Sequence, residues 1–200
     1  YDGVTPIEET MQALVDIVRA GKALYVGISK YPPELQAQCY AYLREQHVPC
    51  LVSQYPASMF RRTSVASAED SNLSVAAKNG SGFVCFSPLA QGLLTTKYFN
   101  GIPANSRAAK ATGFLRTDQV TPERVEAARA LHAIAQERGQ SLPQMALAWL
   151  LHDQRVTSVI IGTSSVAQLN ENLQTLNNLA FTAEELLRID QILSRKGIAM

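Results

Sequence analysis

The 200-residue sequence has no strong charge imbalance and few of the residues that build metal or disulfide sites. Its 18 Lys and Arg residues almost balance 17 Asp and Glu residues, so the formal net charge is +1. This balance argues against a nucleic-acid surface or a polybasic membrane surface. The three cysteines, Cys39, Cys50 and Cys85, are an odd number without metal-ligand spacing, and we predict packing roles in a reducing cytoplasm. No apolar run approaches the ~20 residues that a transmembrane helix needs.

The sequence also lacks the short motifs of several common enzyme classes. It contains no P-loop, no GxSxG elbow and no metal-ligand cluster. Gly101 and Gly113 lie in a long loop without GxGxxG order, which argues against a Rossmann domain. We interpret His47, His132 and His152 as surface or packing residues, because none follows an expected strand. By pattern alone, no residue is an evident general acid or base.

What the sequence does have is an alternation of strand and helix patterns over its whole length. Apolar runs predict strands over residues 23–29, 50–54, 83–86 and 156–161. Helices are expected over residues 33–45, 67–78, 120–138, 166–176 and 182–194, with two more that begin near Pro6 and Ser141. Capping boxes are predicted at Thr5-x-x-Glu8, Ser141-x-x-Gln144 and Thr182-x-x-Glu185. This order predicts a single α/β domain over residues 1–200, with a parallel sheet covered on both faces and no internal boundary.

The most informative stretch, residues 159–172, runs from a short apolar strand through a Gly- and Ser-rich turn into a helix. Such a turn points backbone N–H groups at the helix N-terminus, where an anion such as phosphate binds well. The alternative is an ordinary strand–turn–helix in which Ser165-x-x-Gln168 is a capping box. Residues 82–94 repeat the strand-then-loop plan, which favours the anion-binding interpretation.

The long irregular segment of residues 89–119 is a second candidate, because loops of that length in compact domains are usually functional. Lys97 and Arg107 lie in it among Gly and Pro residues, either as solvated charges or as a clamp on a phosphate. Phe86, just before the loop, is either a core residue or a flat wall for a cofactor ring. Polar residues follow the expected strands, and the active sites of (β/α) barrels lie at that rim.

Residues 87–98, with Gly101-Ile102-Pro103 and Ser106-Arg107, resemble the aldo-keto reductase family. Residues 27–29, 144–150 and 162–172 support the resemblance, which covers almost the whole chain and is closest to the branch of L-glyceraldehyde 3-phosphate reductases and potassium-channel β subunits. It implies the C-terminal half, strands five to eight, of a truncated (β/α)8 TIM barrel that binds extended NADPH.

The resemblance also implies a set of cofactor-binding residues. Contacts to the nicotinamide would come from Ser29 and Gln54 at the carboxamide and from Phe86 stacked on the ring. Contacts to the pyrophosphate would come from Ser87, Leu89, Gln91 and Lys97. Contacts to the adenosine phosphate would come from Arg107, Gly162, Ser164 and Gln168, and to the adenine from Glu171 and Asn172.

Three departures from the family pattern shape the expected function. The family's catalytic Asp, Tyr, Lys and His lie on the first four strands, which this sequence does not contain, so we expect no catalytic residue here and an inactive isolated chain. Lys30 stands where many relatives carry a small polar residue or Asn. Ser165 replaces an Arg that close relatives offer to the 2′-phosphate, which leaves Arg107 as the main residue that distinguishes NADPH from NADH.

The resemblance therefore implies the cofactor-binding half of an NADPH-dependent, cytoplasmic reductase of small aldehydes or ketones, of the glyceraldehyde 3-phosphate type. The alternative is a non-catalytic fragment, or a nucleotide-sensing partner like the channel β subunits. No nucleic acid, membrane or metal is expected as a partner, and a homo-oligomer of the full-length form remains open.

Overall fold

The structure is a computed structural model that describes residues 1–66, 68–110 and 113–200. By its internal contacts the chain divides into two compact units. The first unit comprises Tyr1–Pro56, Thr63–Phe86 and Gln154–Ser158. The second unit comprises Ala57–Arg62, Ser87–Asp153 and Val159–Met200. Because the segments of the two units alternate along the chain, the division falls at no single point of the sequence.

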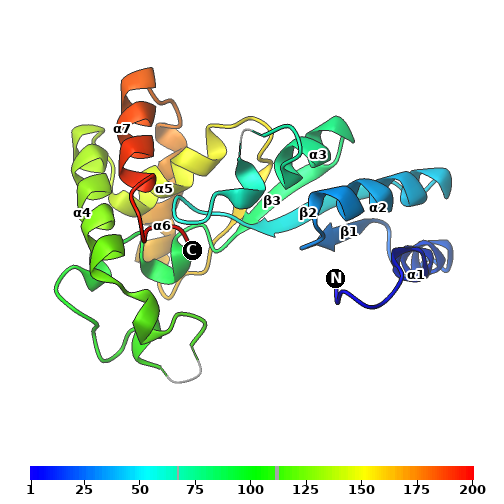
Figure 1. Ribbon diagram of the computed structural model, residues 1–200, viewed down its shortest axis with the longest axis horizontal. Helices are drawn as coiled ribbons and strands as arrows, with labels where there is room; N and C mark the ends of the chain where they lie inside the picture. Colours follow the sequence, from blue (N-terminus) through cyan, green and yellow to red (C-terminus); the bar gives the residue numbers. More distant parts are fainter. Residues whose placement is uncertain (67, 111–112) are drawn as a thin grey trace. The chain divides into compact units, whose positions relative to one another are not determined.

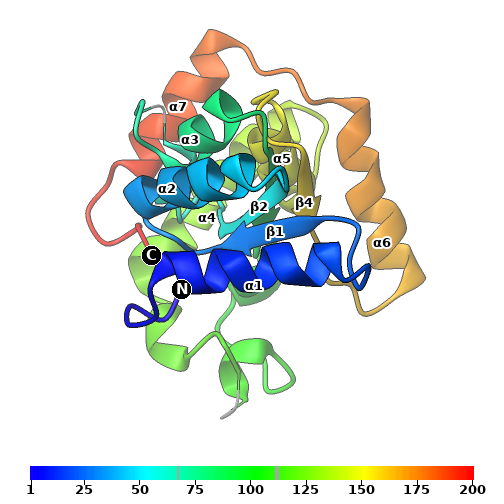
Figure 2. The ribbon, with the colours of Figure 1, turned by 90° about the vertical axis from the view of Figure 1, so that its right-hand side faces the viewer.

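The first unit alternates helices and strands, as the sequence pattern predicts (Figure 1). Its elements are α1 (Ile7–Arg19), β1 (Val26–Ser29), α2 (Pro33–Glu45), β2 (Cys50–Pro56), α3 (Asn72–Lys78) and β3 (Gly82–Phe86), with a 3-10 turn at Thr63–Val65. The helices α1 and α2 pack against each other, and α3 packs against α2 and the strands β2 and β3 (Figure 2). The bounds predicted for α2 are confirmed at both ends.

The sheet is parallel where its register is defined, which confirms the predicted α/β class. The strand order is β1-β2-β3-β4, with β4 at Ser158–Ile160. Ser29 pairs with Gln54, and Gln54 pairs in turn with Val84 on the next strand. A Cβ at Gly27 would lie 2.8 Å from the carbonyl oxygen of Val52, so only glycine allows the two strands to approach this closely.

The expectation that both faces of the sheet are covered is wrong for the strands of the first unit. Their burial alternates, as in a sheet packed on one face. Ser53 and Tyr55 are buried, and the Ser53 hydroxyl lies 2.5 Å from the hydroxyl of Tyr40 on α2. Gln54, between them, is exposed. The helices of the unit thus cover the face that Ser53 shares, and the opposite face carries exposed side chains.

The second unit is a group of helices and short 3-10 turns (Figure 1). The α-helices are α4 (Pro122–Glu137), α5 (Leu142–Leu151), α6 (Val166–Leu173) and α7 (Ala183–Leu193). The 3-10 turns are Ala90–Gly92, Thr96–Tyr98, Arg107–Ala109, Thr117–Gln119 and Gln174–Asn177. Its core contains Leu94 and Leu115 from the long loop together with Leu131, Met145 and Ile189 from three helices. The loop is therefore anchored by apolar side chains at several points.

Local capping chemistry sets most helix starts. Both bonds of the predicted capping boxes that begin at Ser141 and Thr182 are present. The box predicted at Thr5 is wrong, because its hydroxyl donates to the Asp2 carboxylate at 2.6 Å. The helix instead begins after Pro6, whose side chain has no group that could cap it.

Several elements are shorter than their sequence patterns predict. The first strand begins only at Val26, because the register with β2 starts there, and Leu24 and Tyr25 before it are exposed. The helix predicted over residues 67–78 begins at Asn72, after Ser71 accepts a bond from the N–H of Ser74 at 3.2 Å. Ser67, its predicted first residue, lies outside the described residues. Tertiary pairing and capping, more than apolar length, therefore decide these boundaries.

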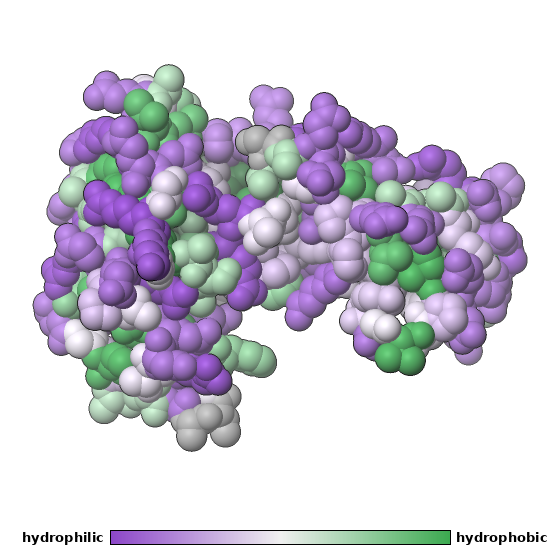
Figure 3. Space-filling view, viewed as in Figure 1, coloured by the Kyte–Doolittle hydropathy of each residue, from purple (hydrophilic) through white to green (hydrophobic). Residues whose placement is uncertain are grey.

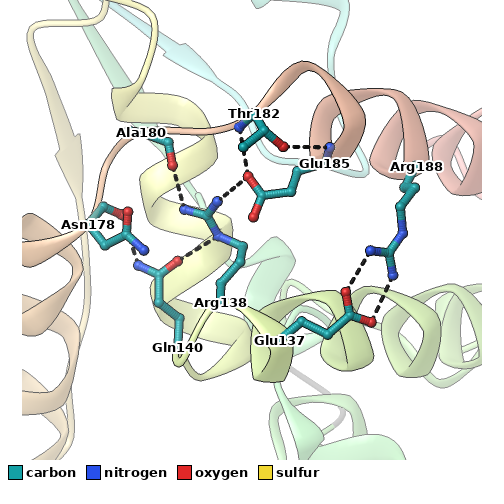
Figure 4. A network of polar contacts seen from close by, with 8 residues as sticks. All are labelled: Glu137, Arg138, Gln140, Asn178, Ala180, Thr182, Glu185 and Arg188. Carbon is teal, nitrogen blue, oxygen red and sulfur yellow. Dashed lines mark hydrogen bonds and ion pairs between the residues drawn. The ribbon is translucent and has the colours of Figure 1, made fainter.

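A polar network joins α4, the turn after it and the start of α7 (Figure 4). Arg138 donates from Nη1 to Glu185 at 2.7 Å, from Nε to Gln140 at 3.0 Å and from Nη2 to the Ala180 carbonyl at 2.8 Å. Its guanidinium also lies 3.7 Å from the centroid of the Phe181 ring. The Arg138 side chain is only 3% exposed, so this network holds a buried charge.

The surface and the interior follow the expected division of residue types. On the face shown in Figure 3, hydrophilic residues predominate over α4 and α7, and hydrophobic residues form scattered patches.

Cys39, Cys50 and Cys85 are all buried, which confirms their predicted packing roles, and burial raises the pKa of the Cys39 thiol to about 11. Within the described residues, no helix is both long and apolar enough to cross a membrane.

Candidate functional site

The turn after β3 has unusual backbone geometry. Ser87, Ala90 and Gln91 adopt positive φ angles of 56°, 47° and 58°. Each is a non-glycine residue in the left-handed region, which costs of order 1 kcal/mol and persists only where surrounding contacts require it. Backbone bonds close the turn, from Ala90 N–H to the Ser87 carbonyl and from Leu94 N–H to the Leu89 carbonyl. Such strain is concentrated at functional sites, so this turn is the first part of the candidate site.

Arg107 reaches this turn from the long loop. Gln91 donates from Nε2 to the Ser87 hydroxyl at 2.8 Å, and its Oε1 accepts from Nη1 of Arg107 at 2.8 Å. Among the described residues, Arg107 is exposed and forms no ion pair with an acid. A Cβ at Gly162 would lie 3.8 Å from Nη2 of Arg107, so the guanidinium lies alongside the Gly- and Ser-rich turn. The second unit thus brings the turn at Ser87 and Gln91, Arg107 of the long loop and the turn at Gly162 together.

The Gly- and Ser-rich turn agrees in part with the capping interpretation of its sequence, and its binding of an anion stays a prediction. Ser165 caps α6 by accepting from the N–H of Gln168 at 3.2 Å. The Gln168 side chain does not return the bond to Ser165; its Oε1 instead accepts from the N–H of Ser164 at 2.9 Å and from its hydroxyl at 3.2 Å. The reciprocal capping box is therefore incomplete, and the Gln168 side chain instead stabilises the turn ahead of α6.

The end of α6 and the 3-10 turn after it carry buried polar atoms without hydrogen-bond partners in the described part of the chain. Asn172 is 4% exposed, and its Nδ2 has no hydrogen-bond partner among the described residues. The same holds for Oγ1 of Thr175. Glu171 is exposed, and its carbonyl accepts from Nε2 of Gln144 at 2.9 Å. A buried amide N–H without an acceptor is unfavourable. The Asn172 amide therefore indicates a place where a ligand or a water molecule supplies the missing acceptor.

Lys97 and Leu89 contribute less to this geometry than the sequence predicts. The Lys97 side chain is exposed, and its backbone N–H donates to the Thr95 hydroxyl at 3.1 Å. The Leu89 side chain packs against the core of the second unit, so only its backbone can meet a phosphate. Both stay predictions as pyrophosphate ligands.

In the first unit, polar and aromatic residues meet at the carboxyl ends of neighbouring strands. The Ser29 hydroxyl donates to the Gln54 carbonyl at 2.7 Å. Phe86 ends β3 and is half-buried, and Nζ of Lys30 lies 5.5 Å from its ring centroid. Lys30 has a φ of 63°, which turns the chain sharply after β1. Of the predicted nicotinamide residues, Ser29 and Phe86 therefore end β1 and β3, and Gln54 lies two residues before the end of β2.

Sequence reasoning did not identify two further buried hydroxyls of the long loop. Tyr98 and Ser106 are 2% and 0% exposed, and neither hydroxyl has a hydrogen-bond partner among the described residues. Both residues lie in the segments that carry the family resemblance, but the resemblance assigns neither of them a cofactor contact. The link between Gln91 and Arg107 was also missed, because 16 residues separate them.

His132 and His152 pack against aromatic rings, and His47 is exposed. The ring of His132 packs edge-on against Phe99, with 5.7 Å between the ring centroids. Nδ1 of His152 lies 2.6 Å from the Trp149 carbonyl oxygen at the end of α5. Over the described ranges, no group of three His, Cys, Asp or Glu side chains could hold a metal ion.

The sequence of this parallel α/β chain matches a known family of oxidoreductases. The model of the aldo/keto reductase family matches residues 1–194, and the chain belongs to that family. It is 47% identical over 193 residues to the L-glyceraldehyde 3-phosphate reductase of Escherichia coli strain K12, and equally to that of Escherichia coli O157:H7. Each alignment covers 95% of this chain and 55% of the relative, so the chain spans about half of the relatives' length. The predicted family is thereby confirmed.

Proposed function

We propose that this chain is the cofactor-binding half of an NADPH-dependent aldo-keto reductase, formed by strands five to eight of a (β/α)8 barrel. The observation that carries the proposal is the exposed guanidinium of Arg107, which is held beside the Gly162 turn without an acidic partner among the described residues. Arginine in such a position suits a phosphate, because its planar fork donates two parallel bonds.

Residues of each unit, taken by itself, fit one part of the cofactor. The buried Nδ2 of Asn172 is a donor that a ring nitrogen of adenine would satisfy. The flat ring of Phe86 is available as a stacking wall at the end of β3. Ser29 already donates its hydroxyl hydrogen to the Gln54 carbonyl, so its oxygen is left to accept from a carboxamide N–H.

The cofactor and the side chains of this chain would have different roles in the reaction. When bound, NADPH supplies the hydride that reduces a carbonyl carbon. The side chains of this chain would bind and orient the cofactor, with Arg107 at a phosphate and Phe86 at the ring. The group that protonates the carbonyl oxygen would come from the family's catalytic residues, which we expect outside this sequence.

The names of the relatives indicate which class of substrate to test. L-glyceraldehyde 3-phosphate, named as the substrate of the Escherichia coli proteins, is the first aldehyde to test. A cytoplasmic setting is supported by the odd number of cysteines, which does not fit a disulfide framework. Turnover by the protein expressed from its complete reading frame would separate a reductase from a non-catalytic nucleotide-sensing partner.

A substitution at Arg107 tests the cofactor proposal. Arg107→Ala should weaken NADPH binding about 10- to 100-fold and change NADH binding little, since a hydrogen bond to a charged group contributes about 1.5–3 kcal/mol. The matched control is Arg116→Ala in the same loop, because the Arg116 guanidinium already pairs with Asp118 at 3.0 Å. Dissociation constants from calorimetry decide the result. An equal loss for both cofactors would place Arg107 on the shared pyrophosphate, and no loss for either would refute the site.

A further inference from the structure

The Gln91 side chain bridges two segments of the candidate site. Its Nε2 donates to the Ser87 hydroxyl and its Oε1 accepts from Nη1 of Arg107, both at 2.8 Å. Both ends of the carboxamide are therefore occupied by protein groups. These two bonds fix the orientation of the carboxamide between the turn and Arg107.

The backbone on both sides of this bridge is held in a costly conformation. Gln91 and its neighbour Ala90 both have positive φ angles, and so does Ser87 at the other end of the turn. A left-handed residue at position 91 directs its side chain differently from an extended one, and the observed direction leads to Arg107. The strained turn thus positions the carboxamide that Arg107 contacts.

The bridge occupies one end of the Arg107 guanidinium and leaves the other end accessible. Nη1 is bound to Gln91, whereas Nη2 lies on the side of Gly162. Gln91 is also neutral, so it holds the guanidinium without cancelling its charge, as a carboxylate would. A long, flexible cation is in this way ordered before any ligand arrives, which lowers the entropy lost on binding.

We infer that Gln91 is a positioning residue that orients Arg107 for the 2′-phosphate and so sets the preference for NADPH over NADH. The inference rests on the proposed function, because it takes the anion at Arg107 to be that phosphate. It differs from a direct pyrophosphate contact, which would serve NADPH and NADH alike.

The test compares dissociation constants of NADPH and NADH for variants of the protein expressed from its complete reading frame. Gln91→Leu should lower the NADPH preference about 2- to 12-fold, the range that corresponds to ordering one long side chain. Gln91→Glu keeps an acceptor for Nη1 but offsets the positive charge of Arg107. It should therefore lower the preference for NADPH over NADH at least as much as Gln91→Leu does. In an Arg107→Ala background, Gln91→Leu should change the preference no further, because the two residues act as one unit.

Gln140→Leu is the matched control, because Gln140 accepts from Arg138 at 3.0 Å in the same kind of contact but belongs to the network around α7. It should lower the thermal stability and leave the cofactor preference unchanged. If Gln91→Leu weakens NADPH and NADH equally, Gln91 contacts the pyrophosphate directly and the inference fails. If Arg107→Ala shifts the preference but Gln91→Leu does not, the inference alone fails; if Arg107→Ala leaves the preference unchanged, the proposed phosphate contact fails as well.

Discussion

The buried Arg138 offers the sharpest test of how the second unit is held together. Replacing Arg138 by Met keeps an apolar stem against Phe181 but removes the charge and three donated bonds. The buried Gln140 then loses the donor to its side-chain oxygen, at about 1–3 kcal/mol, whereas water can replace the donor to the carbonyl of the exposed Ala180. Glu185 keeps a bond from the Thr182 N–H at 2.7 Å but loses its cation. Since breaking a buried ion pair costs about 3–5 kcal/mol, we expect a loss of that size in the free energy of unfolding.

A neighbouring ion pair provides the control (Figure 4). Arg188 and Glu137 are joined at 2.6 Å, but their side chains are 38% and 56% exposed, against 3% and 21% for Arg138 and Glu185. Arg188→Met should therefore cost only about 0–1 kcal/mol. Urea denaturation of both variants, with unchanged slopes, gives the comparison. Equal losses for the two variants, or a loss below about 1 kcal/mol for Arg138→Met, would show that burial does not decide the contribution of these pairs.

Two further outcomes concern titration and reactivity. Burial alone would raise the pKa of Glu185, but a backbone N–H and Arg138 outweigh it and lower the pKa below the ordinary Glu value. Its stabilisation is thus complete above the ordinary Glu pKa and is lost as the pH falls through the lowered folded value; Glu185→Gln should flatten this acid dependence in unfolding measured from pH 3 to 7. Burial raises the pKa of Cys39 to about 11, so iodoacetamide at pH 8 should label it only in urea, as read by mass spectrometry. Rapid labelling of Cys39 in the native protein would contradict its buried position.

Local sequence determined those parts of the fold whose physics is local. The Pro32-Pro33 start and the periodicity after it predict α2 at its observed bounds, because helix initiation needs only neighbouring residues. The capping boxes at Ser141 and Thr182 form for the same reason. The family is also readable from the sequence, since it resides in short contiguous motifs such as residues 87–98.

Contacts between distant segments were decided only by the tertiary structure. Leu24 and Tyr25 have the pattern of a strand, yet the register with β2 begins after them. The sequence marks Gln91 and Arg107 as separate phosphate ligands, whereas folding joins them into one unit. Arginine is ordinarily a surface residue, and only the convergence of α4 and α7 makes Arg138 a buried one. Periodicity and capping act over a few residues, whereas these contacts depend on which side chains the packed backbone brings within hydrogen-bonding distance.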